Sequence, residues 1–211
     1  MPKDNAASGY ATNVFINCPF DVDFEPLFHA IVFAVIQCGY TVRCALEADD
    51  TGATRIDRIY RLIEDCRFGV HDISRIEHDT VNNLPRFNMP FELGLFLGAK
   101  RFGGRPHRQK KSLIFDRAPF RYQSFISDIS GQDIHPHNGK VDQLIRELAT
   151  WLRDQARDPK VPGGIAVADE YSKFKVDLPS IAGDMQLQLS ELTFKDLVAV
   201  VARWIVKEHG T

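Results

Sequence analysis

Apolar residues along the chain form short continuous runs that alternate with longer stretches of helical spacing. The first run, residues 14–18, predicts a short buried strand. Helical spacing follows and ends at Gly39, a residue suited to the C-terminal cap of a helix. The apolar positions of this predicted helix are Phe24, Leu27, Phe28, Ile31, Val32 and Val35. The chain therefore opens with a strand followed by a helix.

The same alternation continues toward the C-terminus. Further strands are predicted at residues 40–46, 67–74 and 111–115, and a fifth within 121–134. Helices are predicted at residues 56–63, 85–100 and 140–157. Strands that alternate with helices pair in parallel, because a parallel pair needs a crossover connection, and right-handed crossovers distribute helices to both faces. The expected fold is α/β, a doubly wound, mainly parallel five-stranded sheet.

The end of the chain is predicted to form a C-terminal helical extension. Residues 159–170, PKVPGGIAVADE, contain proline and glycine and are interpreted as a linker. The final stretch begins with Ser190 as a helix cap and stays strongly apolar through Trp204, which predicts a helix that must pack on something. We therefore expect an α/β domain over residues 1–158 and an extension over residues 159–211.

Composition and charge narrow the range of partners. The formal net charge of the 211 residues is −2, so neither nucleic acid nor a membrane surface is an expected partner. The four cysteines show no C-x-x-C pair, and His135-Pro136-His137 lacks a third ligand at recognisable spacing, so no metal site is predicted. The polar N-terminus and the lack of a membrane-spanning apolar run predict a cytoplasmic protein.

One basic stretch stands out against this neutral background. Residues 100–111, KRFGGRPHRQKK, concentrate lysine and arginine around one phenylalanine. Such a loop can contact RNA, DNA or a phosphorylated ligand. Because the chain as a whole is not basic, we interpret the stretch as a solvated loop.

A single acid lies within an otherwise apolar helical stretch, PRFNMPFELGLFLGAK. Glu92 needs no functional explanation if it complements the positive end of the helix dipole, an interaction that stabilises a helix by about 0.3–1 kcal/mol. Its neighbours are apolar, however, and a buried, unpartnered carboxylate costs several kcal/mol unless its pKa rises. Gly94 and Gly98, four residues apart, also suggest that this helix lies close against another backbone.

Several polar residues are expected to lie near this acid. Ligands of open parallel sheets bind beyond the carboxyl ends of the strands, where the loops after strands one, two and three converge. Those loops contribute Phe20 and Asp21, then Glu47 to Arg55, then Asp72, Ser74 and Arg75. Asp72 is equally well explained as a strand-end turn residue, and Phe20 as a core residue. Asp49, Asp50 and Arg55 read as a solvated turn.

The residues around the acid resemble a known family. Phe91-Glu92-Leu93-Gly94 and the following residues 95–100 resemble the ELG helix of nucleoside 2-deoxyribosyltransferases. The stretch FINCPFD is similar to the strand and Pro-Phe turn of those enzymes. The wider plan, over residues 13–155, resembles the Toll/interleukin-1 receptor (TIR) fold, whose enzymatic members cleave NAD with a glutamate in the equivalent helix. Both groups share a flavodoxin-like core, which is the fold expected here.

The resemblance implies a role for each candidate residue. Glu92 would face C1′ of a bound ribose and stabilise, or attack, the positively charged sugar that forms when an N-glycosidic bond breaks. Asp72 would bind ribose hydroxyls, and Phe20 would stack on a base. Arg86, in the lead-in LPRFNMP, would bind a phosphate, which suits a nucleotide better than a nucleoside. The other implied substrate-binding residues are Asp21, Ser74 and Asn88, of which Asn88 would also cap the helix. The resemblance places Asp49, Asp50 and Arg55 in the loop that borders the NAD site and mediates assembly in TIR proteins.

The expected function is therefore cleavage of the N-glycosidic bond of NAD or a related nucleotide, by a glycohydrolase, cyclase or ribosyl transferase. NAD or the nucleotide would be the substrate, and no cofactor is expected. The resemblance further implies a homo-oligomer, a role in bacterial antiviral defence and a defence-system partner. The alternative is a non-catalytic TIR-like module that senses a nucleotide or self-associates, supported by the apolar face of the last helix.

Overall fold

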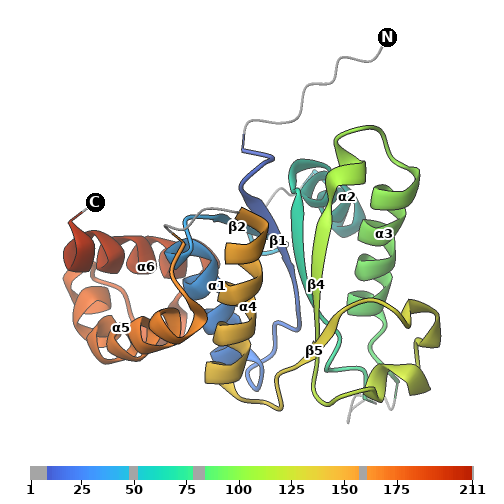
Figure 1. Ribbon diagram of the computed structural model, residues 1–211. Coiled ribbons are helices and arrows are strands. Elements are labelled where there is room, and N and C mark those ends of the chain that lie inside the picture. The colour runs from blue at the N-terminus through green and yellow to red at the C-terminus, as the bar shows by residue number, and fades with distance from the viewer. Residues whose placement is uncertain (1–8, 48–51, 78–83, 157–160, 211) are drawn as a thin grey trace. The chain divides into compact units, whose positions relative to one another are not determined.

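The computed structural model describes residues 9–47, 52–77, 84–156 and 161–210 (Figure 1). The strands are β1 (Asn13–Asn17), β2 (Thr41–Cys44), β3 (Phe68–Asp72), β4 (Lys111–Asp116) and β5 (Ile134–Pro136). The helices are α1 (Glu25–Gln37), α2 (Arg55–Asp65), α3 (Asn88–Phe102), α4 (Val141–Ala156), α5 (Gly164–Asp184) and α6 (Phe194–His209). Short 3-10 turns are η1 (His107–Gln109), η2 (Arg121–Ser124), η3 (Ser127–Ile129) and η4 (Leu189–Glu191).

The strands form one sheet in the order β2-β1-β3-β4-β5, and every neighbouring pair is parallel. The chain moves from β1 to one edge and then returns past β1 to β3, so the strand order reverses between β1 and β3. β1 and β3 are buried along their whole length, as expected of central parallel strands. The doubly wound, flavodoxin-like α/β fold predicted from the sequence is confirmed, together with helices at the C-terminal end. The fifth strand, predicted within residues 121–134, begins only at Ile134, and the residues before it form η2 and η3.

The chain divides into two compact units. The first contains Met1–Val22 and Thr41–Gly139, and so holds the sheet with α2 and α3. The second contains Asp23–Tyr40 and Lys140–Thr211, and so holds α1, α4, α5 and α6. The predicted domain division between residues 158 and 159 lies outside the described residues and stays a prediction.

In the first unit, α2 and α3 cover the same face of the sheet. Phe15 of β1 packs in one cluster with Phe96 of α3 and with the apolar face of α2. Helix α2 begins with a capping box, in which Thr54 and Asp57 bond reciprocally to each other's backbone N–H. At its other end, the buried amine of Lys110 donates to the carbonyl oxygens of Ile63 and Cys66. The capping box stabilises the start of α2, and Lys110 ties its end to the segment before β4.

The two glycines of α3 do not serve the purpose expected of them. A Cβ built at Gly94 or at Gly98 would meet nothing within 4 Å outside the helix itself. The prediction of a close backbone approach is therefore wrong, since a larger side chain would find room at both positions.

The second unit has an aromatic core. Phe33 of α1 stacks on Phe174 of α5, with ring centroids 5.0 Å apart, and contacts Trp204 of α6 at 5.5 Å. Gly39 adopts the left-handed conformation (φ +80°) expected at the end of α1. The last helix therefore packs within its own chain, as the sequence required.

Two predictions for the C-terminal region are wrong. Residues 164–170, predicted as linker, form the first turns of α5, because Val167, Ala168 and Tyr171 recur at helical spacing and are buried. The N-cap of α6 is Thr193, which forms a capping box with Asp196; Ser190 lies in the preceding 3-10 turn. No helix among the described residues has the length and apolarity needed to cross a membrane.

Candidate functional site

Glu92 lies in the second turn of α3, with only 8% of its side chain exposed. The first turn contains no acidic residue, so complementing the helix dipole does not account for this acid. Its Oε1 lies 3.9 Å from Nη2 of Arg55, the first residue of α2. The packing of α2 beside α3 thus brings a cation to the acid that the sequence singled out.

The environment of Glu92 sets its protonation near neutral pH. Burial raises the pKa of Glu92 from 4.5 to about 7, and the charge of Arg55 opposes this rise. Because Arg55 is more than half exposed, solvent weakens its attraction, and burial prevails. Glu92 therefore exchanges its proton close to pH 7, which suits a group that serves as acid, base or nucleophile.

Other carboxylates gather around Cys18, which directly follows β1. The thiol is buried, and burial raises its pKa well above the ordinary value. The negative charges of Asp72, Glu92 and Asp21 raise it further, so all three lie within electrostatic range of the same sulfur. Residues from the ends of β1 and β3 and from α3 therefore converge, at the position where the strand order reverses and where open sheets of this type bind ligands. The raised pKa keeps Cys18 protonated and makes it a poor nucleophile.

A buried hydrogen-bond network holds α3 against the sheet. Nδ2 of Asn17, the last residue of β1, donates to the carbonyl oxygen of Met89 in the first turn of α3 at 2.9 Å. The same nitrogen lies 3.1 Å from Nδ1 of His71, its partner in the register of β1 and β3. An amide nitrogen only donates, so Nδ1 accepts and Nε2 carries the proton. Burial, followed by the charge of Lys110, lowers the pKa of His71 to about 3, which keeps the ring neutral.

Asp72 is wholly buried, and groups of its own chain surround both carboxylate oxygens. Oδ1 accepts the backbone N–H of Ser74 at 2.9 Å, and Oδ2 lies 3.2 Å from Nε2 of His137. The N–H of Gly139 donates to Nδ1 of His137, which leaves the ring proton of the neutral form on Nε2, toward Asp72. These contacts match the reading of Asp72 as a strand-end turn residue.

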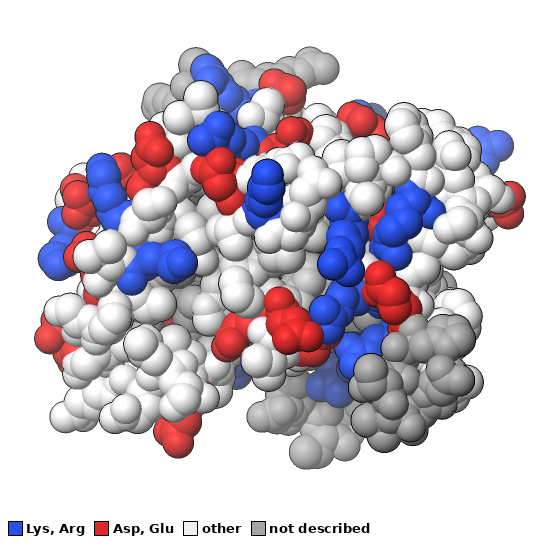
Figure 2. All heavy atoms as spheres, turned by 90° about the horizontal axis from the view of Figure 1, so that it is seen from below, with Lys and Arg blue, Asp and Glu red and all other residues white. Residues whose placement is uncertain are grey.

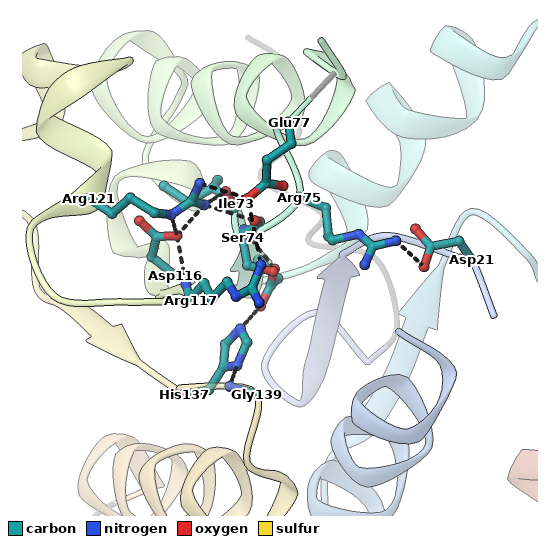
Figure 3. A network of polar contacts seen from close by, with 11 residues as sticks. Asp21, Ile73, Ser74, Arg75, Glu77, Asp116, Arg117, Arg121, His137 and Gly139 are labelled. Carbon is teal, nitrogen blue, oxygen red and sulfur yellow. Dashed lines mark hydrogen bonds and ion pairs between the residues drawn. The ribbon is translucent and has the colours of Figure 1, made fainter. Parts of the chain in front are cut away.

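A second buried carboxylate, Asp116, ends the neighbouring strand β4. Its Oδ1 accepts from Nε of Arg121 at 2.9 Å and from Nη2 at 2.6 Å. The same guanidinium donates to the carbonyl oxygens of Ile73 and Ser74, as Figure 3 shows. Arg121 therefore ties the loop after β3 to the end of β4.

Asp21 is bound by two arginines from different loops. Its Oδ1 accepts from Arg75 at 3.1 Å, and its Oδ2 accepts from Arg86 at 3.0 Å (Figure 3 shows the first pair). Figure 2 views the protein from the end at which the strands finish, and Lys and Arg side chains there lie closely among Asp and Glu side chains. Two guanidinium groups thus share one carboxylate at this edge of the sheet.

The remaining predicted residues differ in exposure. Phe20 is 36% exposed. Asn88 is exposed at the first position of α3, but the N-cap is Phe87 and no side chain bonds there, so the capping role predicted for Asn88 is wrong. Ser74 is buried and contributes backbone groups only to the contacts above. Asp49 and Asp50 lie outside the described residues.

Arg55 was expected in a loop near Glu92, but it read as part of a solvated turn and was given no role beside the acid. Asn17 and His71 were not predicted as residues of this site. A signal for the last two existed, because each is a polar residue within a run of buried strand residues. The position of its loop brought Arg55 near Glu92, but the ion pair itself was not predictable, since it depends on how α2 and α3 pack.

No protein-family model matches this chain, and no curated protein or solved structure is significantly similar to it. The chemistry of the site therefore has to be inferred from its own geometry. Among the described residues, no group of three or more His, Cys, Asp and Glu side chains is placed to hold a metal ion. The candidate site therefore consists of Glu92, which is nearly buried and has a pKa near neutrality, the adjacent guanidinium of Arg55, and the polar residues at the carboxyl ends of the strands.

Proposed function

We propose that the protein cleaves the N-glycosidic bond of NAD or a related nucleotide, with Glu92 as the catalytic carboxylate. The observation that carries the proposal is the burial of Glu92 at the carboxyl end of the sheet, with a pKa raised to about 7. A structural carboxylate would have been expected to reach solvent or a close ion pair. Within the part of the chain that the structure describes, the ion-pair partner of Glu92 is the guanidinium of Arg55, at 3.9 Å.

The chemistry follows from the charge of the sugar. When the bond between C1′ and the base nitrogen breaks, the base leaves with the electron pair and the ribose becomes a cation. A carboxylate in apolar surroundings stabilises that cation more strongly than one in water, or bonds to C1′ directly. Water, a second base or a hydroxyl of the substrate then bonds to C1′ and loses its proton, giving hydrolysis, transfer or cyclisation.

The arginines at the same edge favour a substrate that carries phosphate. Arg86 and Arg75 both bind Asp21, and a phosphate group can compete with this carboxylate for either guanidinium. Phe20, a partly exposed aromatic residue at this edge, would stack on a base. A nucleotide or dinucleotide therefore fits this edge better than a nucleoside.

The alternative, a non-catalytic nucleotide-sensing or self-associating module, loses its support in the sequence. That support was the apolar face of the last helix, and Leu197, Val200 and Trp204 on this face are buried. Self-association and a role in antiviral defence stay predictions drawn from the resemblance.

Turnover with matched variants tests the proposal. Concentrated protein is incubated with NAD, NADP and a panel of nucleosides and nucleotides, and released base is measured by chromatography. We expect wild type and Glu64→Gln, which alters an exposed acid of α2, to release base equally. Glu92→Gln should be slower by at least about 100-fold while remaining folded. Wild-type rates in Glu92→Gln, or no base released by wild type from any compound, would contradict the proposal.

A further inference from the structure

A hollow lies in the first unit, near the C-terminal end of α3, whereas Glu92 lies near the start of that helix. Its volume is about 630 Å³, within the range of roughly 300–1,000 Å³ typical of small-molecule sites. Its lining residues are Leu97, Lys100 and Arg101 of α3, Arg108 of η1, and Gln132 before β5. Lys100 lies eight residues beyond Glu92, about 12 Å along the helix axis. The hollow is therefore a separate place from the candidate site above.

The charges around this hollow are unbalanced. Three of its five lining residues are cations, and none is an acid. Within the described residues, the side chains of Lys100, Arg101 and Arg108 form no ion pair or hydrogen bond.

The same unit pairs other arginines with acids. Arg43 is bound by Glu47, and Arg121 by Asp116. The acid next to Gln132 in sequence, Asp133, lies 3.2 Å from the His135 ring. The cations around this hollow, unlike Arg43 and Arg121, have no acid among the residues that line the space with them.

The helix dipole accounts for only part of this arrangement. Lys100 and Arg101 lie in the last turn of α3, where cations gain about 0.3–1 kcal/mol from the negative end of the dipole. That effect does not explain why Arg108, from a separate turn, lines the same hollow. Three like charges around one space repel each other, and an anion between them relieves the repulsion.

We propose that this hollow binds the phosphate groups of a nucleotide-sized ligand. Lys100, Arg101 and Arg108 would bind the phosphates, Gln132 would hydrogen-bond to the ligand, and Leu97 would provide an apolar contact. The basic stretch 100–111, interpreted from sequence as a solvated loop, thereby contributes a site. The inference does not rest on Glu92, because no residue is shared between the two places.

Calorimetric titration with ADP, pyrophosphate and adenosine tests the proposal. The protein carries Glu92→Gln, so that the proposed reaction does not consume the ADP. The site variant adds Arg101→Gln and Arg108→Gln, and the control adds Arg105→Gln, which removes an exposed charge of the same stretch that does not line the hollow.

We expect ADP and pyrophosphate to bind at least tenfold more weakly to the site variant than to the control, and adenosine not to bind at this site. The binding should weaken as salt rises, because it is electrostatic. Equal affinities of the two variants for ADP and pyrophosphate would overturn the proposal, as would absence of binding at millimolar concentration. Loss of base release in Glu92→Gln, measured separately, bears only on the proposed function.

Discussion

At the scale of single residues, the protonation of Glu92 results from two opposed effects. Removal from water favours the neutral acid, and the guanidinium of Arg55 favours the anion; burial prevails and brings the pKa to about 7. A positively charged sugar in the site would favour the anion further. The same residue would therefore be about half protonated when the site is empty at neutral pH, and ionised as the reaction proceeds.

The raised pKa of Glu92 predicts how its replacement changes stability with pH. The carboxyl ionises near 4.5 in the unfolded chain and near 7 in the folded protein. Between these values only the unfolded chain loses its proton, so wild type loses stability as pH rises, and the loss is complete above about pH 7. Glu92→Gln does not ionise. The melting temperature of Glu92→Gln minus that of wild type should therefore be larger near pH 8 than near pH 5.

Thermal unfolding followed by circular dichroism at both pH values checks this prediction. Glu64→Gln serves as the control and should change the melting temperature little at either pH, because Glu64 is exposed. The same difference between Glu92→Gln and wild type at both pH values would show that Glu92 titrates as an ordinary acid.

At the scale of elements, α3 is placed by contacts that join distant parts of the chain. The amide of Asn17 links the end of β1 to the Met89 carbonyl and to His71 of β3. These partners lie 72 and 54 residues away in sequence, so the pattern of apolar residues contains no trace of the link. The order of strands and helices was predictable, because apolar runs report burial. The contacts that position Glu92 were not predictable, because they join residues far apart in the sequence.

Asn17→Asp tests whether this link positions Glu92. The carboxylate is nearly the same size but donates no hydrogen bond, so the Met89 carbonyl and His71 lose their donor. We expect a loss of about 1–3 kcal/mol in the free energy of unfolding and a fall in turnover of at least tenfold.

Asn13→Asp is the matched control, because Asn13 donates a similar bond to the Asp65 carbonyl from the other end of β1, at 3.0 Å. It should lose comparable stability and keep most of its turnover. Equal losses of turnover in both variants, measured well below their melting temperatures, would show that Asn17 affects turnover only through the stability of the fold.

Two predictions about helices were wrong because they relied on proline and glycine content instead of on the spacing of apolar residues. The proline and glycine of residues 159–170 suggested a linker, but the apolar spacing from Val167 onward continues as helix α5. Gly94 and Gly98 suggested close packing, and the space beside both is open. In each case the glycine content was the weaker signal, because glycine is tolerated in a helix for many reasons.

At the scale of the whole molecule, the C-terminal helices are part of a core and not a detachable tail. Trp204 of α6 is fully buried against Phe33 of α1 and Phe174 of α5, and its Nε1 donates to Asp177 at 3.0 Å. Trp204→Ala should lower the free energy of unfolding by about 3–5 kcal/mol, because it leaves a large cavity. Val206→Ala, on an exposed part of the same helix, should change it by less than about 0.5 kcal/mol.

Chemical denaturation of both variants measures these differences. If Trp204→Ala were as stable as Val206→Ala, α6 would contribute little to the folded core. The apolar face of the helix would then again support self-association.

The identity of the broken bond tests the central claim most directly. Wild-type protein is incubated with NAD, and the products are identified by chromatography coupled to mass spectrometry. The account predicts free nicotinamide in an amount equal to the NAD consumed, or the corresponding free base if another nucleotide is the substrate. Products in which the bond between base and ribose stays intact, such as AMP with nicotinamide mononucleotide, would contradict the role assigned to Glu92.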